Sequence, residues 1–352
     1  MSDDATATTP SGLSGFLRSL VHRLPGDAAA LPVEGELPSF AGATGWLNSE
    51  PLTLEGLRGR VVFVDFWTYT CVNWLRTLPY VRAWAAKYAG QGLTTIGVHT
   101  PEFDFERDVD NIVAQARALG VPYPIAVDSD YGVWRAFDNH YWPAVYIADA
   151  QGRIRYHHFG EGEYAMQEMV VQQLLLEAGA DDVDQELVSV DPVGLEVAAD
   201  YRTLRSPETY LAYGQATGLA SPDGLRADES HDYAPSSGLR LNQWAPSGSW
   251  SISRRAAAAT APKARLAIRF QARDVNLVMG PAVRGTAIPF RVHLDGQPAT
   301  GAHGTDVDVD GNGTVTEQRT YQLIRQPAPI SERTFEIEFL DPGVELFCFT
   351  FG

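Results

Sequence analysis

The chain has 352 residues, enough for two domains, and its composition is that of a globular protein, with 45% hydrophobic and 20% charged residues. The formal net charge of -17 argues against binding to nucleic acid or to an anionic membrane, because both attract clustered Lys and Arg. No run of about 18 apolar residues occurs, so the sequence predicts no transmembrane span.

Residues 1–33 are rich in Ala, Ser, Thr, Pro and Asp, and we expect them to form a flexible leader. They contain neither a basic n-region nor an apolar h-region, so we predict no signal peptide. The two cysteines, Cys71 and Cys348, are far apart in sequence and give no disulfide framework. The lack of a predicted signal peptide and the lack of a disulfide framework both favour a location in the reducing cytoplasm.

Residues 34–182 alternate short apolar runs with segments of helical spacing. The last two predicted strands are joined by a short turn, which indicates a hairpin. This order predicts an α/β domain with a mixed central sheet and helices on both faces. The predicted strands cover residues 52–54, 61–67, 94–100, 123–127, 144–148 and 153–159, and the predicted helices cover 72–89, 108–119, 132–137 and 163–178.

The composition changes after an acidic linker at residues 183–206. From 207 to 352, helical spacing nearly vanishes, and short alternating runs are separated by turn signals such as Asp295-Gly296. This pattern predicts an antiparallel β-sandwich.

The strand at 61–67 leads into Cys71, which opens the following helix. The N–H groups and dipole of a helix N-terminus favour the thiolate, so we expect a lowered thiol pKa. The alternative is a buried, inert cysteine that acts as a small hydrophobic residue. In a dithiol C-x-x-C site the fourth position is a second cysteine, but here it is Trp74. Any mixed disulfide on Cys71 therefore needs a thiol from outside this motif.

Several motifs resemble those of a thioredoxin-fold redoxin: Phe66-Trp-Thr-Tyr-Thr-Cys71, Pro79, and Trp142-Pro143 before a strand. The segments 97–103, 139–144 and 158–163 more narrowly resemble the C-terminal region of DipZ-type proteins, in which a carbohydrate-binding-module-like sandwich follows a thioredoxin-like domain. The resemblance covers about residues 35 to 352. Two features depart from it: the DipZ membrane domain is missing, and Trp74 replaces the second cysteine. By analogy alone, that family favours an extracytoplasmic location.

The resemblance implies a cis peptide bond at Trp142-Pro143, beside the attacking sulfur. The backbone of Trp142 would then pair with a substrate segment, and Trp67, Trp142 and Pro143 would line the substrate groove. Asp65 resembles the buried acid of thioredoxins that assists proton transfer to the resolving thiol. Its role is open because that thiol is absent.

Other residues near Cys71 are candidates for a supporting role. His99 and Glu102 follow the neighbouring strand, where an imidazole would activate the thiol and a carboxylate would relay protons; the alternative is a capped turn. Arg76 would favour the thiolate, but we expect it to point to solvent. Thr68 precedes Cys71 by three residues, which resembles the Thr that peroxiredoxins place three residues before their reactive cysteine. The match is incomplete, because Val64 stands where the peroxiredoxin signature has a proline.

The predicted sandwich carries three further candidates. Asp306 to Glu317 has EF-hand loop spacing, but strands rather than helices flank it, so we expect a hairpin turn and no metal or other cofactor. Cys348 lies in an apolar strand, where we expect a packed core residue rather than a resolving thiol. The third set consists of aromatic residues that could stack on sugar rings if exposed, although we favour a core position for them: Tyr233, Trp244 and Trp250.

These features favour a thioredoxin-like thiol–disulfide oxidoreductase that works through the single Cys71. Its partners would be a protein or small-molecule disulfide and an external, glutathione-like thiol. One alternative is a non-catalytic protein that binds peptide or glycan on the same scaffold. Another is a one-cysteine thiol peroxidase, in which peroxide oxidises Cys71 to a sulfenic acid.

Overall fold

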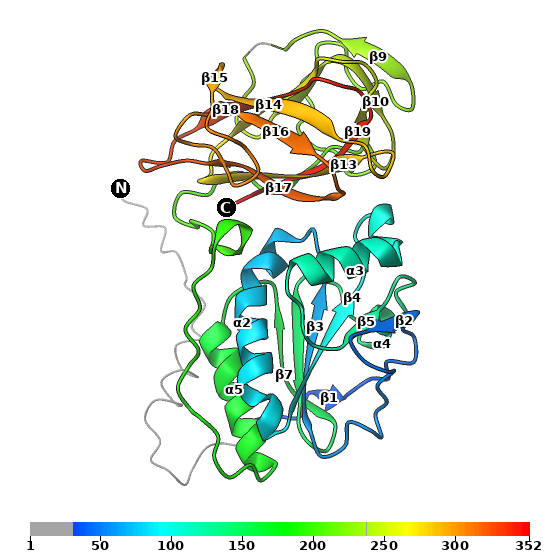
Figure 1. The fold of residues 1–352 in the computed structure, drawn as a ribbon, viewed down its shortest axis with the longest axis vertical. Coiled ribbons are helices and arrows are strands. Elements are labelled where there is room, and N and C mark those ends of the chain that lie inside the picture. The colour runs from blue at the N-terminus through cyan, green and yellow to red at the C-terminus, as the bar shows by residue number, and fades with distance from the viewer. Residues whose placement is uncertain (1–30, 237) are drawn as a thin grey trace, which may run out of the picture.

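The computed structural model describes residues 31–236 and 238–352. Nearly all of the predicted leader, 1–33, lies outside these residues. The described chain forms an N-terminal domain built on a seven-stranded sheet and a C-terminal domain built on a twelve-stranded sheet, stacked along the long axis (Figure 1). None of the described helices is long and apolar enough to cross a membrane.

The N-terminal sheet is mixed, as predicted, with strand order β1-β7-β6-β3-β4-β5-β2. Strands β3, β4 and β5 run parallel, and the remaining pairs are antiparallel. The strands are β1 (Gly35–Glu36), β2 (Gly45–Leu47), β3 (Val61–Trp67), β4 (Leu93–His99), β5 (Ile125–Val127), β6 (Ala144–Ala148) and β7 (Arg153–Phe159). The helices are α2 (Val72–Tyr88), α3 (Val109–Ala118), α4 (Gly132–Ala136) and α5 (Tyr164–Glu177), with 3₁₀ turns η1 (Ala89–Gln91) and η2 (Asp104–Arg107).

Strand β3 is buried along its whole length because helices cover both faces of the sheet. Phe63 and Trp67 pack with residues of α2, α3 and α5, whereas Val64 and Phe66 pack on the other face with Val133 of α4. Since side chains alternate along a strand, Asp65 shares the face of Phe63 and Trp67 and points toward α2. This face carries the candidate site.

Two details of the N-terminal domain differ from the sequence prediction. Residues 52–54 are not a strand; they lead into a series of turns. The short edge strands β1 and β2 were not predicted, because two or three residues are too few for a visible alternation. The predicted linker contains a 3₁₀ turn, η3 (Gly194–Glu196), that is tied to α2 by an ion pair of 2.5 Å between Arg82 and Glu196.

The C-terminal domain agrees with the predicted antiparallel architecture, but its two halves are one continuous sheet. Strand β10 (Trp244–Ile252) pairs with β12 in one half and with β9 and β11 in the other, so the sheet curls around a shared core. The other strands are β8 (Thr209–Tyr210), β9 (Ser230–Tyr233), β11 (Ala257–Ala259), β12 (Ala264–Phe270), β13 (Asp274–Pro281), β14 (Ile288–Leu294), β15 (Gln297–Pro298), β16 (Asn312–Val315), β17 (Arg319–Arg325), β18 (Arg333–Phe339) and β19 (Val344–Phe351).

The three aromatic side chains considered for sugar stacking are core residues. Trp244 and Trp250 are fully buried, and their indole N–H groups donate to the carbonyl oxygens of Thr217 and Ser247 at 2.9 and 3.0 Å. Tyr233 is 2% exposed. The glycan-stacking hypothesis is therefore wrong for these rings, since none presents a face to solvent.

The segment with EF-hand spacing is a turn that leads into β16. One carboxylate oxygen of Asp308 accepts hydrogen bonds from the backbone N–H groups of Asp310 and Asn312 at 3.0 and 2.8 Å. Asp306 pairs instead with Arg319 at 2.7 Å. Within residues 31–236 and 238–352, no group of three or more His, Cys, Asp or Glu side chains is arranged to hold a metal ion.

Candidate active site

Cys71 lies at the junction of β3 and α2, where it is the N-cap residue of the helix. Its backbone is extended, its N–H donates to the carbonyl of Thr68 at 3.2 Å, and its own carbonyl accepts from Leu75 at 3.0 Å. The side chain is partly exposed and forms no cap of its own. The backbone N–H groups of Trp74 and Asn73 face the sulfur and lower the thiol pKa.

The net effect of the surroundings on Cys71 is opposite to the predicted one. Burial raises the pKa of its thiol well above the ordinary value, and the negative charges of Glu102 and Glu208 raise it further. These effects outweigh the two helical N–H groups. The expectation of a lowered pKa is therefore wrong for this arrangement, in which burial comes first and the charges of Glu102 and of Glu208 from the C-terminal domain add to it.

Trp74 fills the position of the resolving cysteine with a fully buried indole. The ring stacks on Trp67, with ring centres 4.2 Å apart, and its N–H donates to a carboxylate oxygen of Asp65 at 2.8 Å. Burial raises the pKa of Asp65 to about 7, while the bonds from Trp74 and Tyr123 lower it. The buried acid expected from the resemblance is thus present, but its partner is an indole N–H.

Trp67 and His99 are both internal. Trp67 is fully buried, so its proposed place in the substrate groove is wrong. The His99 ring packs edge-on against Trp67 and stacks on Tyr69, and burial lowers its pKa to about 3. The imidazole is neutral, as activation of the thiol would require, but no hydrogen bond joins it to Cys71 in the described chain.

Glu102 lies at the contact between the two domains. Its carboxylate accepts a hydrogen bond from the hydroxyl of Tyr210 in β8, and the same hydroxyl lies 3.3 Å from Glu208. Burial, together with the charges of Glu208 and Glu106, raises the pKa of Glu102 to about 8. Of the predicted supporting residues, Glu102 is therefore placed where a proton can be held near Cys71 at neutral pH.

Glu106 is a site residue that sequence reasoning missed. It is fully buried and accepts hydrogen bonds from the Thr70 hydroxyl at 2.6 Å and from the backbone N–H groups of Glu102 and Phe103 at 2.6 and 2.9 Å. Burial raises its pKa, which the hydroxyls of Thr68 and Thr70 partly oppose. Glu106 thereby joins the segment before Cys71 to the loop that carries Glu102. In the sequence, the one feature that sets it apart is an acidic residue next to the phenylalanines 103 and 105.

Arg76 does not point to solvent, contrary to expectation. It is 4% exposed, pairs with Glu161 at 2.9 Å, and donates to the backbone carbonyl of Phe351 at 3.0 Å. The guanidinium thereby links α2 to the end of β19. Its role is to hold the two domains together.

The Trp142-Pro143 peptide bond is cis, as the resemblance implies. Pro143 is buried and precedes Ala144, which pairs with Phe66 at the end of β3 that leads to Cys71. The Trp142 ring packs on Trp134, and its N–H donates to the carbonyl of Thr100 at 3.1 Å. The loop thus occupies the same end of the sheet as the cysteine.

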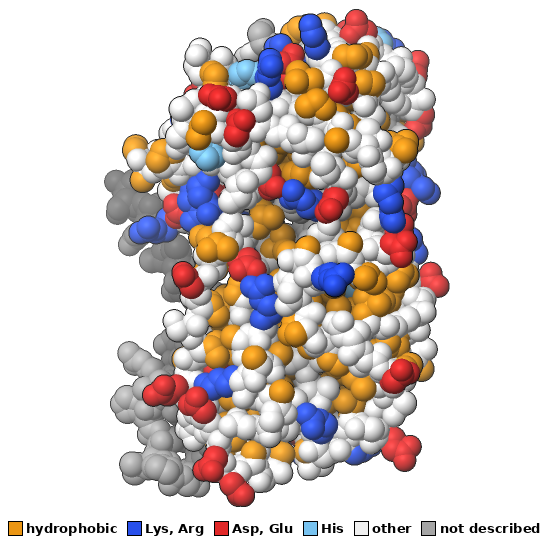
Figure 2. Space-filling model, in the orientation of Figure 1, with side chains coloured by type: hydrophobic (Ala, Val, Ile, Leu, Met, Phe, Trp, Pro, Cys, Tyr) orange, Lys and Arg blue, Asp and Glu red, His pale blue; other side chains and the backbone are white. Residues whose placement is uncertain are grey.

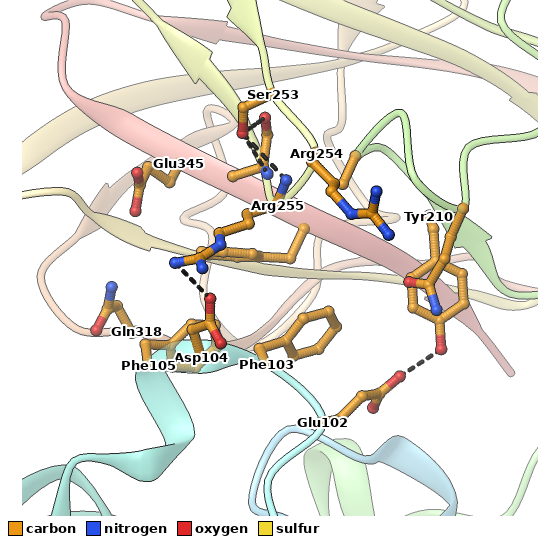
Figure 3. A pocket seen from close by; sticks show the side chains of 14 residues that line it. Glu102, Phe103, Asp104, Phe105, Tyr210, Ser253, Arg254, Arg255, Gln318 and Glu345 are labelled. Atoms are coloured by element: carbon orange, nitrogen blue, oxygen red, sulfur yellow. Dashed lines mark hydrogen bonds and ion pairs between the residues drawn. The ribbon is translucent and has the colours of Figure 1, made fainter. Parts of the chain in front are cut away.

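A cleft of about 560 Å³ opens between the domains beside Glu102 (Figure 3). Phe103 and Phe105 line it from the N-terminal domain, and Tyr210, Arg254 and Phe347 line it from the C-terminal domain. An ion pair of 2.8 Å between Arg255 and Asp104 spans its edge. Sequence analysis missed the cleft because its walls are more than 100 residues apart in the chain.

Comparison with known proteins agrees with this geometry. Residues 33–157 match the AhpC/TSA family, and residues 206–352 match the family described as thioredoxin like C-terminal domain. The chain is 33% identical over 142 residues to the thiol-disulfide oxidoreductase YkuV of Bacillus subtilis, covering 40% of this chain and 95% of YkuV. The chain belongs to the thioredoxin-like redoxin family.

Two further relatives extend the comparison. This redoxin is 36% identical over 333 residues to the protein DipZ of Mycobacterium bovis, covering 92% of the chain and 44% of DipZ. It thus spans less than half of the DipZ sequence. A thioredoxin-like protein solved in its oxidized form is 32% identical, with a TM-score of 0.38, and matches 41% of this chain and 97% of its own.

Proposed function

We propose that this redoxin exchanges disulfides through Cys71 alone. The sulfur of Cys71 attacks a disulfide of a protein or small molecule, a mixed disulfide forms, and the substrate's other sulfur leaves as a thiolate that takes up a proton. The observation that carries the proposal is the position of Cys71 at the N-terminus of α2, at the same end of the sheet as the cis Pro143 loop. The backbone of Trp142 would pair with the substrate segment there.

Trp74 requires that the mixed disulfide be resolved in trans. An indole forms no disulfide, so an external thiol of the glutathione class attacks the mixed disulfide and restores the Cys71 thiol. Such thiols are abundant in a reducing cytoplasm, where the proposal places the protein. Asp65, which assists the resolving thiol in dithiol relatives, here holds the Trp74 indole in place.

The raised thiol pKa implies that attack follows a local separation of the domains. In the closed arrangement, burial disfavours the thiolate, and the carboxylates of Glu102 and Glu208 add to this effect when they are ionised. A substrate that separates the domains near Glu102 would move Glu208 away from the sulfur and leave the helical N–H groups as the main influence. Glu102, which is protonated at neutral pH, would then donate a proton to the leaving thiolate.

A glutathionylated peptide tests the proposal. With glutathione present, the wild type should release the free peptide thiol catalytically, and Cys71→Ser should lose essentially all of this activity. Cys348→Ser is the matched control and should retain it, because the external thiol resolves the mixed disulfide. Equal release by Cys71→Ser and by the wild type would refute the proposal.

The two alternative functions have less support from the site. A one-cysteine peroxidase agrees with the AhpC/TSA match and needs the same Cys71 thiolate, but Val64 stands at the proline position of the peroxiredoxin signature. Peroxide consumption that depends on Cys71 and exceeds the disulfide exchange rate would favour this alternative. A non-catalytic binding protein would bind its peptide equally well after Cys71→Ser and would release no thiol.

A further inference from the structure

We infer that Cys348 is a second redox thiol, which captures the mixed disulfide on Cys71 when no external thiol does so. The inference rests on the proposed attack by Cys71 and adds an intramolecular route beside resolution in trans. Its basis is that the C-terminal domain presents Cys348 on the sheet face that contacts Thr70 and Glu102.

The strand register places Cys348 in a row of side chains along this face. Cys348 of β19 lies opposite Tyr210 of β8 on one side and opposite Val278 of β13 on the other, and Val278 lies opposite Thr320 of β17. Residues directly opposite one another on adjacent strands point to the same face of a sheet. The four side chains therefore project together.

Both ends of this row bind the N-terminal domain. The Tyr210 hydroxyl donates to Glu102, and the Thr320 hydroxyl donates to the backbone carbonyl of Thr70 at 2.7 Å. Cys348 lies between these two contacts and packs in a cluster that includes Phe103. By contrast, Phe349 packs in the core of its own domain.

These contacts place Cys348 on the same interface as the segment that leads into Cys71. Thr70 immediately precedes Cys71, and at a strand spacing of about 4.8 Å, Cys348 lies two strands, or roughly 10 Å, along the sheet from Thr320. A disulfide needs Cα atoms about 5.5–6 Å apart. Pairing therefore requires the domains to move relative to one another, at the same interface that must open to admit a substrate.

The same two carboxyl groups influence both thiols. Burial raises the pKa of Cys348, as do the charges of Glu208 and Glu102, which also raise that of Cys71. The Cys348 thiol donates to the carbonyl of Phe349 at 3.3 Å, and Glu208 lies near it: burial raises the pKa of Glu208, and the influence of Tyr210 and Cys348 lowers it. Glu208 is thus positioned to accept the proton of Cys348 during its attack.

The proposed step conserves atoms and electrons. The sulfur of Cys348 attacks the sulfur of Cys71 in the mixed disulfide, and a new bond forms between the two cysteines. The bond from Cys71 to the substrate sulfur breaks, and the substrate leaves as a thiolate that takes up the Cys348 proton. The substrate disulfide is reduced by two electrons and the protein is oxidised by two; an external dithiol then reduces the protein disulfide.

Ellman's reagent, an aromatic disulfide, tests this step on the native chain without added thiol. The wild type should release two thionitrobenzoate ions per chain, become lighter by two hydrogens, and yield a proteolytic fragment in which Cys71 and Cys348 are linked. Cys348→Ala should release one ion and retain one adduct. Cys71→Ala should release none while folded, because Cys348 is only 1% exposed.

The outcomes separate the two proposals. A stable adduct on wild-type Cys71, or adducts on both cysteines, would overturn the role of Cys348 and leave attack by Cys71 intact. Absence of release from the folded wild type, with full release after unfolding, would overturn the proposed attack itself. The fragment analysis uses only the wild type, so it decides the question even if Cys348→Ala folds poorly.

Discussion

The indole N–H of Trp74 donates a 2.8 Å hydrogen bond to the carboxylate of Asp65, and both side chains are fully buried. The bond joins the residue three positions after Cys71 to the buried acid of strand β3. A buried carboxyl group without a partner is costly, so Trp74 has a structural function even though it has no redox chemistry.

Trp74→Phe should test the value of this bond. The change removes the indole N–H and leaves Asp65 with one partner fewer, so it should cost about 1–3 kcal/mol beyond the loss of volume. Trp84→Phe is the matched control, because Trp84 is 1% exposed and its N–H has no partner in the described chain. Chemical denaturation of both variants would measure the difference. Equal losses of stability would mean that the bond contributes nothing.

Asp65→Asn should change how stability depends on pH. Folding raises the pKa of Asp65 from its ordinary 3.8 to about 7, so the wild type loses stability as the pH rises through this interval, with a limiting slope of about 1.4 kcal/mol per unit. Asp65→Asn lacks this pH-dependent loss, so its free energy of unfolding should rise relative to that of the wild type between pH 4 and 7. Denaturation curves across this range would measure the gain, and a constant difference would contradict the raised pKa.

Asp149→Asn is the control of opposite sign. Although burial opposes the shift, bonds from Arg153 and Arg155 lower the pKa of Asp149, so its ionised form stabilises the folded protein. That stabilisation is present above the ordinary pKa of 3.8 and is lost as the pH falls. The stability deficit of Asp149→Asn relative to the wild type should therefore grow as the pH rises through the acidic range.

Trp74→Cys should restore a dithiol site. The introduced thiol, three residues after Cys71, would occupy the first turn of α2, and mild oxidation should join it to Cys71 and yield a chain lighter by two hydrogens. The lost indole should cost about 3–5 kcal/mol of stability. Mass spectrometry of the oxidised variant gives the answer. Disulfide-linked dimers alone would show that residue 74 does not have the position of a resolving cysteine.

The sequence predicted the secondary structure better than the environment of the site. Strand β3 has the predicted bounds because seven consecutive buried residues give an unmistakable apolar run. The pKa of Cys71, the contacts of Arg76 and the burial of Trp67 were wrongly predicted. The charge of Glu208 near Cys71 and the bond from Arg76 to Phe351 come from a domain more than 130 residues further along the chain, and nothing local to residues 61–76 encodes how that domain packs. On the face drawn in Figure 2, acidic and basic side chains are interspersed over both domains.

Gly97→Ala should show how tightly the Trp67–Trp74 stack is packed. A Cβ atom at Gly97 would lie 2.7 Å from the indole nitrogen of Trp67 and 3.1 Å from the Tyr123 ring, both internal groups with little room to move. We expect a loss of about 1–3 kcal/mol. Gly90→Ala, where a Cβ meets nothing within 4 Å, should leave stability nearly unchanged. Thermal unfolding of the pair measures the contrast, and equal melting temperatures would contradict the packing.

Tyr210→Phe should accelerate the reaction of Cys71 with iodoacetamide. The hydroxyl of Tyr210 joins the domains through Glu102, and its loss both weakens the interface and removes a bond that lowers the pKa of Glu102. A more fully protonated Glu102 opposes the Cys71 thiolate less, so both effects act in the same direction. We expect a rate increase of several-fold near pH 8, roughly the effect of 1 kcal/mol.

Tyr213→Phe is the matched control for that experiment. Its hydroxyl donates to Asp228 at 2.8 Å, so the variant loses a tyrosine hydrogen bond of the same kind inside the C-terminal domain and away from Glu102. Its alkylation rate should equal that of the wild type, as followed by intact mass against time. If both variants react faster, general loosening of the domain is responsible. If neither does, the Tyr210–Glu102 contact does not limit access to Cys71, and the closed interface must depend on Arg76 and Thr320 instead.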